Sequence, residues 1–262
     1  MVEFTPVIIL TGSGRGIGFA ILQYLLGLPN PPNILATSRN ISAIEPLAAA
    51  HKNLEVISVD FSAPSSELKT IIPDVVIHTA VSRWGRIDAL LLNHGTLDPI
   101  AKVDVAALED WESNYRVNFL SNVELIRNAL PELRKSNGRI VLVSSGASSI
   151  YFTGWGAYGS TKAALNHLNS TLALEEPSIT TIAIAPGIVD TDMQAALRGV
   201  HGKVMSSGEN AFFNSLKENN SMVKPEDVGA VLANLALQVE KALSGKYLNW
   251  DDEILSSYRT RL

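Results

Sequence analysis

Seven short apolar runs recur along the chain, and most of the segments between them are long enough to form helices. These runs are VIIL (7–10), NILATS (33–38), LEVISVD (54–60), IDALLLN (87–93), RIVLVSS (139–145), ITTIAIA (179–185) and GKYLNW (245–250). Strands that are apolar along most of their length are typical of sheets covered on both faces. The pattern therefore predicts an α/β fold, with a doubly wound parallel sheet of about seven strands and helices on both faces.

The segments between these runs differ in how clearly they indicate helices. Residues 17–28 and 162–174 have helical spacing, and so do residues 65–84, although Pro73 disfavours helix at the residue before it and predicts a kink or break. Residues 190–220 lack periodicity and are polar and rich in Gly and Ser, which favours a mobile loop or substrate lid. Residues 106–133 predict a long helix with one buried stripe, formed by Leu108, Trp111, Tyr115, Phe119, Val123 and Ile126.

Length, charge and composition limit the kind of protein. With 262 residues, 46% of them hydrophobic, and no linker-like segment, the chain is expected to form a single domain over residues 1–262. A net charge of −5 without any block of Lys or Arg argues against nucleic acid or a membrane as partner and favours a small molecule. The absence of cysteine, of long apolar stretches and of His ligand spacing predicts a cytoplasmic protein without disulfides or a metal site.

A glycine-rich stretch, TGSGRGIG at residues 11–18, directly follows the first apolar run. Glycines allow a tight turn and let a pyrophosphate approach the amide N–H groups at the start of a helix. The stretch departs from G-x-G-x-x-G, because Ile17 stands at the third glycine position, and matches T-G-x-x-x-G-x-G instead. A purely structural turn is the alternative, but the position after the first strand favours a dinucleotide. The predicted contacts are Gly12, Ser13, Arg15, Gly16, Ile17 and Gly18.

The end of the second predicted strand indicates which dinucleotide binds. A carboxylate there would favour NAD, whereas Thr37-Ser38-Arg39 contains no acid before Glu45. Arg39, with Arg15 and the Ser38 hydroxyl, could hold a 2′-phosphate through charge-assisted hydrogen bonds, which favours NADPH. The alternative is that both arginines are solvated loop residues.

The end of the third predicted strand carries Asp60 and Phe61. Asp60 could accept a hydrogen bond from the adenine amino group while the Phe61 ring lies alongside the base. A helix N-cap within DFSAPSSE is the other interpretation of the acid.

Further motifs stand in a fixed order along the chain: LNHG (92–95), Asn118 in YRVNFLSN, VSSGA (143–147), YGSTK (158–162) and APGIVDTDM (185–193). With the glycine turn, they resemble the short-chain dehydrogenase/reductase family over nearly the whole chain. Residues 154–167, together with APGIVDTDMQ and LKENN, are similar to its benzil reductase ((S)-benzoin forming) and sepiapterin reductase-like group. The resemblance implies a Rossmann-type domain, an NADP-dependent oxidoreductase and a homodimer or homotetramer built on the long helices.

The residues that would carry the chemistry are Ser145, Tyr158 and Lys162. Reduction of a ketone needs a proton at oxygen while charge develops there, and a free tyrosine, with a pKa of about 10, is a poor donor near neutrality. Lys162 lies one helical turn from Tyr158, so its ammonium group is expected to lower the pKa of Tyr158. The family's spacing selects Ser145 over Ser144 as donor to the carbonyl oxygen, and it assigns Asn118 to a proton-relay water.

The resemblance also implies contacts with the rest of the cofactor. Lys162 and Tyr158 would reach the nicotinamide ribose, and Asn93 and Gly95 would support the cofactor and the sheet. Pro186 and Gly187 would bend the chain past the nicotinamide. The Ile188 backbone and the Thr191 hydroxyl would hold its carboxamide. The family's N-N-A-G is Leu92-Asn93-His94-Gly95 here. His94 could line the cofactor channel or be a packed structural histidine, and it is assigned no catalytic role.

Aromatic residues before Tyr158, namely Tyr151, Phe152 and Trp155, suggest a pocket that accepts aromatic groups, although core or subunit packing is an equal alternative for the last two. We expect an NADPH-dependent carbonyl reductase acting on a neutral ketone or 1,2-diketone. An alcohol dehydrogenase working in the oxidative direction and a nucleotide-sensing scaffold without chemistry remain as alternatives.

Overall fold

All seven apolar runs form strands of one parallel sheet in the computed structural model, which describes residues 5–260. The strand order is β3-β2-β1-β4-β5-β6-β7, so the direction of winding reverses between β1 and β4. The predicted fold class is confirmed, and in such sheets ligands bind at this reversal, at the carboxyl ends of the strands. The strands are β1 (Val7–Thr11), β2 (Asn33–Ser38), β3 (Leu54–Ser58), β4 (Ala89–Leu92), β5 (Arg139–Val143), β6 (Thr180–Ala185) and β7 (Tyr247–Asn249).

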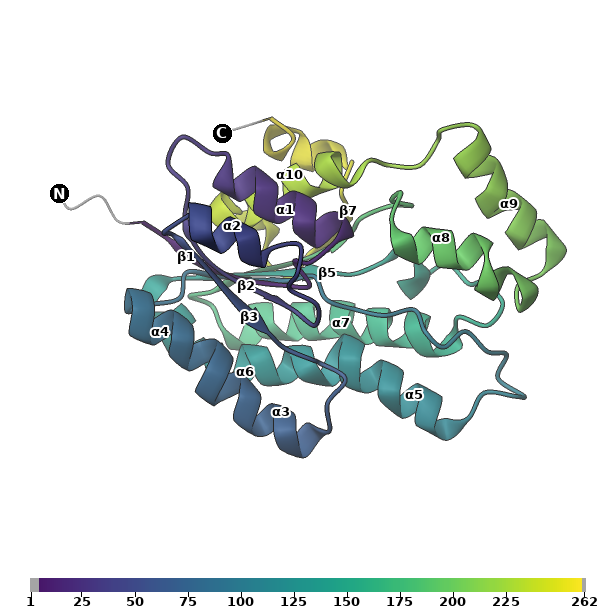
Figure 1. The fold of residues 1–262 in the computed structure, drawn as a ribbon, viewed down its shortest axis with the longest axis horizontal. Coiled ribbons are helices and arrows are strands. Elements are labelled where there is room, and N and C mark those ends of the chain that lie inside the picture. Colours follow the sequence, from purple (N-terminus) through teal and green to yellow (C-terminus); the bar gives the residue numbers. More distant parts are fainter. Residues whose placement is uncertain (1–4, 261–262) are drawn as a thin grey trace.

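Helices cover both faces of the sheet (Figure 1). One layer consists of α1 (Gly16–Leu26), α2 (Glu45–Ala50) and α10 (Pro225–Gln238), and the other of α3 (Ser65–Ile71), α4 (His78–Trp84), α6 (Ser121–Ser136) and α7 (Gly156–Glu175). Successive side chains of β1 enter opposite cores: Ile8 packs in the first and Ile9 in the second, both fully buried. Burial on both faces explains why the strands are apolar throughout.

Two π turns interrupt the long helices. The turn η1 (Ile72–Ile77) joins α3 to α4, so the irregularity predicted at Pro73 is a widened turn within one helix. The turn η2 (Arg116–Leu120) joins α5 (Leu108–Tyr115) to α6. The predicted stripe of this helix is partly wrong, because Leu108 is 70% exposed and Phe119 is half-buried, while Asn118 is fully buried. Asn114, one turn earlier in α5, is also fully buried, so a polar face of this helix, and not only an apolar stripe, is turned inward.

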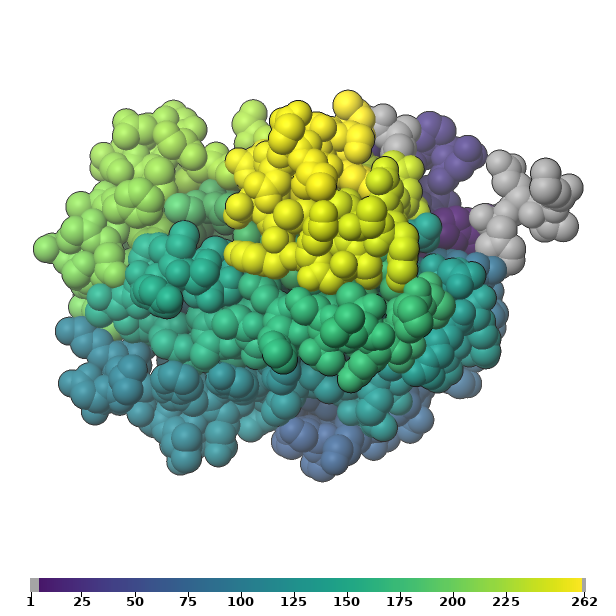
Figure 2. Space-filling model, turned by 180° about the vertical axis from the view of Figure 1, so that it is seen from behind, coloured from purple at the N-terminus to yellow at the C-terminus, as the bar shows by residue number. Residues whose placement is uncertain are grey.

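The segment 190–220, which we call the lid segment, is helical, so the predicted irregular loop is wrong. It contains α8 (Asp192–Arg198), the 3-10 turn η4 (Val200–Lys203) and α9 (Ser207–Glu218). It lies beyond the carboxyl ends of the strands in Figure 1, and Figure 2 shows it as a lobe at the edge of the molecule. Lys217 Nζ lies 2.8 Å from Asp190 Oδ2, which joins the two ends of the segment.

The remaining turns are η3 (Gly146–Ser148) after β5, η5 (Lys241–Leu243) before β7 and η6 (Glu253–Tyr258) after it. Figure 2 shows the C-terminal segment spread over the back of the molecule. Within residues 5–260, no helix combines the length and the apolarity that a membrane crossing requires.

Candidate active site

A cavity of about 680 Å³ lies at the carboxyl ends of the central strands. Most residues predicted to bind cofactor or substrate line it: Gly12, Arg15, Gly16, Ile17, Ser38, Arg39, Asp60, Phe61, Asn93, Gly95, Tyr158, Lys162, Pro186 and Thr191. Other predicted residues lie behind this wall or beside it, namely Ser13, Gly18, Asn118, Ser145, Gly187 and Ile188. The structure thus brings the glycine turn and the Tyr-Lys pair, 140 residues apart in the sequence, to one cavity.

The glycine turn has the conformation that its sequence requires. Gly12 and Gly16 have φ of +68° and +54°, a region that side chains disfavour. A Cβ on Gly18 would lie 2.1 Å from the carbonyl oxygen of Gly12, so α1 packs directly on the turn. Ser13 is buried, and both its N–H and its hydroxyl donate to the Thr37 carbonyl, at 3.0 and 3.1 Å. Gly18 and Ser13 therefore shape the turn from behind.

The start of α1 fits an anionic group. No side chain caps the helix and no acid lies in its first turn, so its first N–H groups and its dipole are available to a phosphate. These features, with the open glycines, fit the pyrophosphate of a dinucleotide.

Two of the predicted cations border this end of the cavity. Arg39 is exposed after β2, and a Cβ on Gly14 would lie 2.5 Å from Ser38 Oγ, which places that hydroxyl against the glycine turn. Arg15 Nη1 lies 3.0 Å from Asp192 Oδ2 of the lid segment, and both side chains are more than 70% exposed. Exposed ion pairs contribute little to stability, so Arg15 can exchange this partner for a phosphate at low cost.

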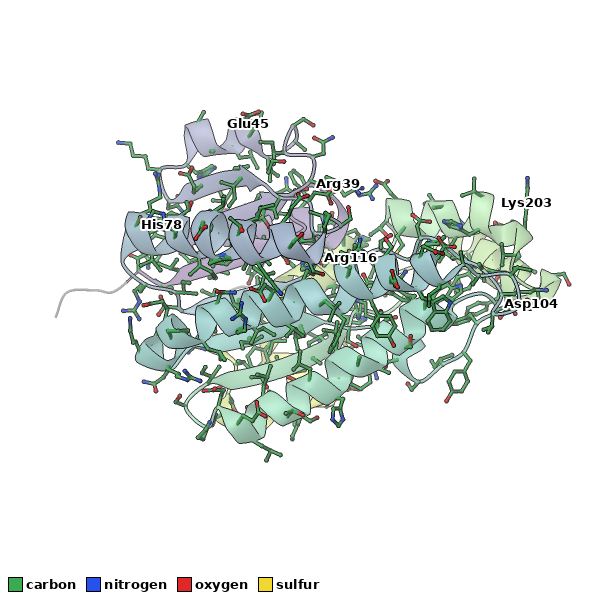
Figure 3. The ribbon with its side chains drawn as sticks, turned by 90° about the horizontal axis from the view of Figure 1, so that it is seen from below. Arg39, Glu45, His78, Asp104, Arg116 and Lys203 are labelled. Atoms are coloured by element: carbon green, nitrogen blue, oxygen red, sulfur yellow. The ribbon has the colours of Figure 1, made fainter. Side chains whose placement is uncertain are left out.

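The end of β3 excludes one of the two interpretations of Asp60. Asp60 Oδ1 accepts hydrogen bonds from the Ser62 hydroxyl at 2.6 Å and the Ser62 N–H at 2.9 Å, which lower the pKa of Asp60. The helix α3 begins after Pro64 without a side-chain cap, so the N-cap alternative for Asp60 is wrong. Arg116 donates to the Ser62 carbonyl at 3.3 Å, a contact that the sequence did not indicate. Arg116 and Arg39 are both labelled in Figure 3.

Tyr158 and Lys162 lie one turn apart near the start of α7 and are 8% and 3% exposed. Lys162 Nζ lies 5.6 Å from the centre of the Tyr158 ring and donates to the Val143 carbonyl at 2.8 Å. Burial raises the pKa of Tyr158, which a hydrogen bond with Ser145 partly offsets, and burial lowers the pKa of Lys162 to about 8. The direction for Tyr158 is opposite to the prediction, because burial, with a smaller contribution from the Tyr247 side chain, outweighs the hydrogen bond with Ser145.

The two serines after β5 have different partners. Ser144 donates to Asn166 Oδ1 at 2.6 Å, so its hydroxyl is directed toward the body of α7. Ser145 accepts from the Ala147 N–H at 3.1 Å and also hydrogen-bonds with the Tyr158 side chain. Ser145 is therefore the serine in contact with Tyr158, whereas Ser144 is the one of the two that lines the cavity.

Asn118 lies inside the π turn η2, fully buried behind the cavity wall. Its side chain accepts from the Thr96 N–H at 2.7 Å and donates to the Thr96 carbonyl at 2.8 Å. A Cβ on Gly95 would lie 2.9 Å from Asn118 Oδ1 and 3.5 Å from Lys162 Nζ. The missing side chain of Gly95 therefore allows Asn118 and Lys162 to approach the same point of the backbone.

The loop after β6 meets the glycine turn. Gly187 has φ of +75° and bends the chain after Pro186, which lines the cavity. Thr191 packs against Gly16, where a Cβ would lie 3.2 Å from its methyl group. The Ile188 carbonyl accepts from the Val223 N–H at 2.9 Å, so that oxygen has a structural partner.

His94 both lines the cavity and is packed. It is 8% exposed, its ring stacks on Phe61 with centroids 3.9 Å apart, and its two nitrogens lie 2.8 Å from Thr11 Oγ1 and Ser121 Oγ. The departure from N-N-A-G was the sequence signal for this residue. Nothing in the sequence indicates its partners, because Ser121 lies on a different element.

Trp155 is a packing residue between the lid segment and Tyr158. Its ring stacks on Phe213 of α9 at 5.9 Å and meets Tyr158 edge-on at 5.8 Å, and Phe152 lies at 4.7 Å. Tyr151, in contrast, is 89% exposed. The aromatic residues thus connect the lid to the Tyr158 ring.

Comparison with known proteins agrees with this arrangement. A family model described as short chain dehydrogenase matches residues 6–200. An uncharacterized oxidoreductase of Saccharomyces cerevisiae is 39% identical, covering 96% of this chain and 98% of the relative. A protein of the same yeast named benzil reductase ((S)-benzoin forming) is 33% identical, covering 95% and 97%. A solved short chain dehydrogenase/reductase from S. cerevisiae has a TM-score of 0.91 at 38% identity, covering 97% of this chain and 100% of that one.

Proposed function

The chain belongs to the short chain dehydrogenase family and is an oxidoreductase, and we propose that it reduces a neutral ketone or 1,2-diketone with NADPH. One observation carries the proposal: a single cavity is bordered by an uncapped helix start with Arg15 and Arg39 and by the buried pair Tyr158 and Lys162. Similarity to a yeast benzil reductase supports the substrate class.

The residues of this chain have separate tasks in such a reaction. When bound, the reduced nicotinamide supplies the hydride. The Tyr158 hydroxyl donates the proton to the carbonyl oxygen, and Ser145 donates a hydrogen bond to the same atom. Lys162, as a cation, stabilises the phenolate that Tyr158 becomes after it has lost its proton.

A neutral substrate fits the charges of the cavity. Among the described residues, the lysines and arginines that line it are Arg15, Arg39 and Lys162. The first two are assigned to the cofactor phosphate and the third to Tyr158, which leaves no lining cation for an anionic substrate.

The activity is tested by following NADPH oxidation with a panel of diketones and aryl ketones, with Tyr158→Phe as the inactive control. An inert panel, or full activity in the Phe variant, contradicts the proposal. Faster oxidation of alcohols at neutral pH would favour the reverse reaction, and cofactor binding without turnover would favour a nucleotide sensor.

The cofactor preference is tested with Arg39→Ala. Loss of a charge-assisted contact with the 2′-phosphate is expected to raise the Kd for NADPH roughly tenfold or more and to leave the Kd for NADH nearly unchanged. Arg83→Ala, which removes an arginine on α4, is the control. Tighter binding of NADH than of NADPH by the wild type would overturn the preference.

We also propose a cytoplasmic homodimer or homotetramer. A solved yeast relative at 38% identity is described as a cytoplasmic protein, which supports the location. Leu108 and Leu174, on the long helices, are 70% and 85% exposed, which supports an interface there. Sedimentation measurements test the oligomer, and a monomer would contradict it.

A further inference from the structure

His94 lies where three parts of the site meet. Nδ1 lies 2.8 Å from Oγ1 of Thr11, which ends β1 just before the glycine turn. Nε2 lies 2.8 Å from Oγ of Ser121, the first residue after the turn η2 that contains Asn118. The ring face stacks on Phe61, which follows β3, at 3.9 Å and 21°. One side chain therefore connects the cofactor turn, the π turn and the end of β3.

The hydrogen bonds define a neutral ring with its proton on Nε2. Ser121 Oγ lies 2.7 Å from the Val117 carbonyl, which can only accept, so the hydroxyl proton points there and the oxygen accepts from Nε2–H. Thr11 Oγ1 already accepts from the N–H groups of Asn93 at 3.0 Å and His94 at 3.3 Å, and of the two acceptors for its proton, Nδ1 at 2.8 Å is much nearer than the Leu91 carbonyl at 3.5 Å. Every polar atom of this chain of bonds then has a partner.

Electrostatics agree with the neutral form. Burial, together with the positive charge of Lys162, lowers the pKa of His94 to about 3. The ring therefore stays uncharged through the physiological range, and it can hold its neighbours without adding a second cation beside Lys162.

The backbone groups that His94 holds lie next to Lys162 and Asn118. Gly95 follows His94 directly, and the side chains of Asn118 and Lys162 both approach its backbone. The Val117 carbonyl, fixed through Ser121, belongs to the same π turn as Asn118. A shift of the His94 ring would therefore move both sides of the pocket in which the Lys162 ammonium group lies.

We propose that His94 is a positioning residue, whose neutral ring holds Gly95 and the π turn at the spacing that sets Lys162 beside Tyr158. The inference rests on the proposed function for its kinetic readout. It predicts an effect on turnover more than on cofactor affinity, because the ring acts on the lysine side of the site.

The experiment compares His94→Ala with His94→Gln, whose amide N–H can still donate to Ser121, and with His167→Ala, an exposed histidine on α7 as control. In His94→Ala, kcat is expected to fall roughly ten- to a hundredfold while the Kd for NADPH changes less than about threefold. His94→Gln should recover most of kcat. Ser121→Ala should lower kcat as well, and its effect should not add to that of His94→Ala.

Two kinetic results would overturn the inference. Unchanged kcat with only a lower melting temperature would mean that His94 is merely a packing residue. A raised Kd for NADPH with unchanged kcat would mean that it acts through Phe61 on the adenosine half.

Nitrogen NMR of the wild type tests the geometry without turnover. The His94 ring should remain neutral with Nε2–H from about pH 5 to 8, and this signature should be lost in Ser121→Ala. A ring that is protonated or carries its hydrogen on Nδ1 overturns the inference. If none of the ketones tested supports NADPH oxidation by the wild type, the proposed function fails. The NMR result alone then decides the role of His94.

Discussion

Lys162 is a charged group that the fold keeps almost entirely out of water. Its pKa is lowered from the ordinary 10.5 to about 8 by burial, so it gains and loses its proton close to neutral pH. The proposed reaction needs the charged form beside Tyr158. The fold therefore holds this charge at some expense of stability. One prediction tests the need for the charge in the proposed reaction, and a second tests its effect on stability.

The first concerns pH. Because the ammonium form of Lys162 predominates below pH 8, the reduction rate should be high near pH 7 and fall as the pH rises through about 8. Lys162→Arg stays charged to well above pH 10, so whatever activity it retains should lack this fall. The measurement is kcat between pH 6 and 10. A wild-type rate that stays constant to pH 10 would contradict the assignment.

The second concerns stability. The pKa of Lys162 is lower in the folded state than in the unfolded state, so the free energy of unfolding increases as the pH rises from 8 to 10.5. Stability is therefore greatest above pH 10.5, and this part of it is lost as the pH falls toward 8. At pH 7, Lys162→Met should therefore raise the free energy of unfolding by about 2 kcal/mol while activity disappears. Urea unfolding at pH 7 measures this. A less stable Met variant would show that the hydrogen bond to Val143 outweighs the burial of charge.

At the same scale, the sequence predicted the local features that residue type and spacing determine. Tyr158 and Lys162 follow from one helical turn, and Gly12 and Gly16 from a backbone that needs positive φ. The roles of Thr11 and His94 could not be predicted, because each depends on partners that only the fold brings near. The direction of the Tyr158 pKa was wrong for the same reason: burial is a property of the packed molecule.

At the scale of elements, burial explains what sequence could predict. Strands covered on both faces are apolar throughout, so each lay within the predicted run, or, for β1, within one residue of it. The helices α8 and α9 face solvent on much of their surface, and their apolar residues are too few to show a period. One local signal was present: Ser206 and Glu209 form a capping box at the start of α9, and S-x-x-E is readable in the sequence.

Glu209 also attaches the lid segment to the body. Its carboxylate accepts from Ser206 and, at 2.8 Å, from the Thr153 N–H in the loop before α7. Burial alone would raise the pKa of Glu209, but these hydrogen bonds lower it to about 2, so the contact stays charged throughout the range in which the enzyme is expected to work. The stabilisation is present above the ordinary pKa of 4.5 and is lost only as the pH falls toward 2.

We therefore expect Glu209→Gln to loosen the lid without unfolding the protein. The apparent KM for the ketone should rise several-fold and α9 should be cleaved faster by proteases, while the melting temperature changes little. Glu218→Gln, at the exposed end of the same helix, is the control. Equal KM values in the two variants would show that the Thr153 contact does not hold the lid.

For the whole molecule, the winding order explains why one cavity gathers residues from so many elements. The chain leaves the first half of the sheet at β3 and returns next to β1 as β4, so loops on either side of this point diverge and leave a crevice. The register places Thr11 level with Thr37 and Leu92, so the ends of β1, β2 and β4 are aligned at its floor. Because parallel strands all end on the same side, the residues predicted after the first four strands lie at this edge.

One buried side chain of α10 joins α1 to the C-terminal segment, in the helix layer opposite the long α5–α6 helix (Figure 1). Asn234 of α10 is fully buried, accepts from the Tyr24 hydroxyl of α1 at 3.0 Å, and donates to the carbonyls of Tyr258 at 2.7 Å and Thr260 at 2.9 Å. Asn234→Ala removes these bonds in a site closed to water, so the free energy of unfolding should fall by about 2–3 kcal/mol. Gln238→Ala, exposed on the same helix, should have almost no effect.

Urea unfolding of both variants measures the difference, and the Kd for NADPH should remain the same because the cavity is on another edge of the molecule. A loss in Asn234→Ala no larger than in Gln238→Ala would show that the C-terminal segment is held by its apolar contacts, Leu255 and Tyr258 among them, rather than by this asparagine. An unchanged slope of free energy against urea would show that the variant still unfolds as one unit. In that case the loss measures a contact that ties the first helix to the last turn of one cooperative domain.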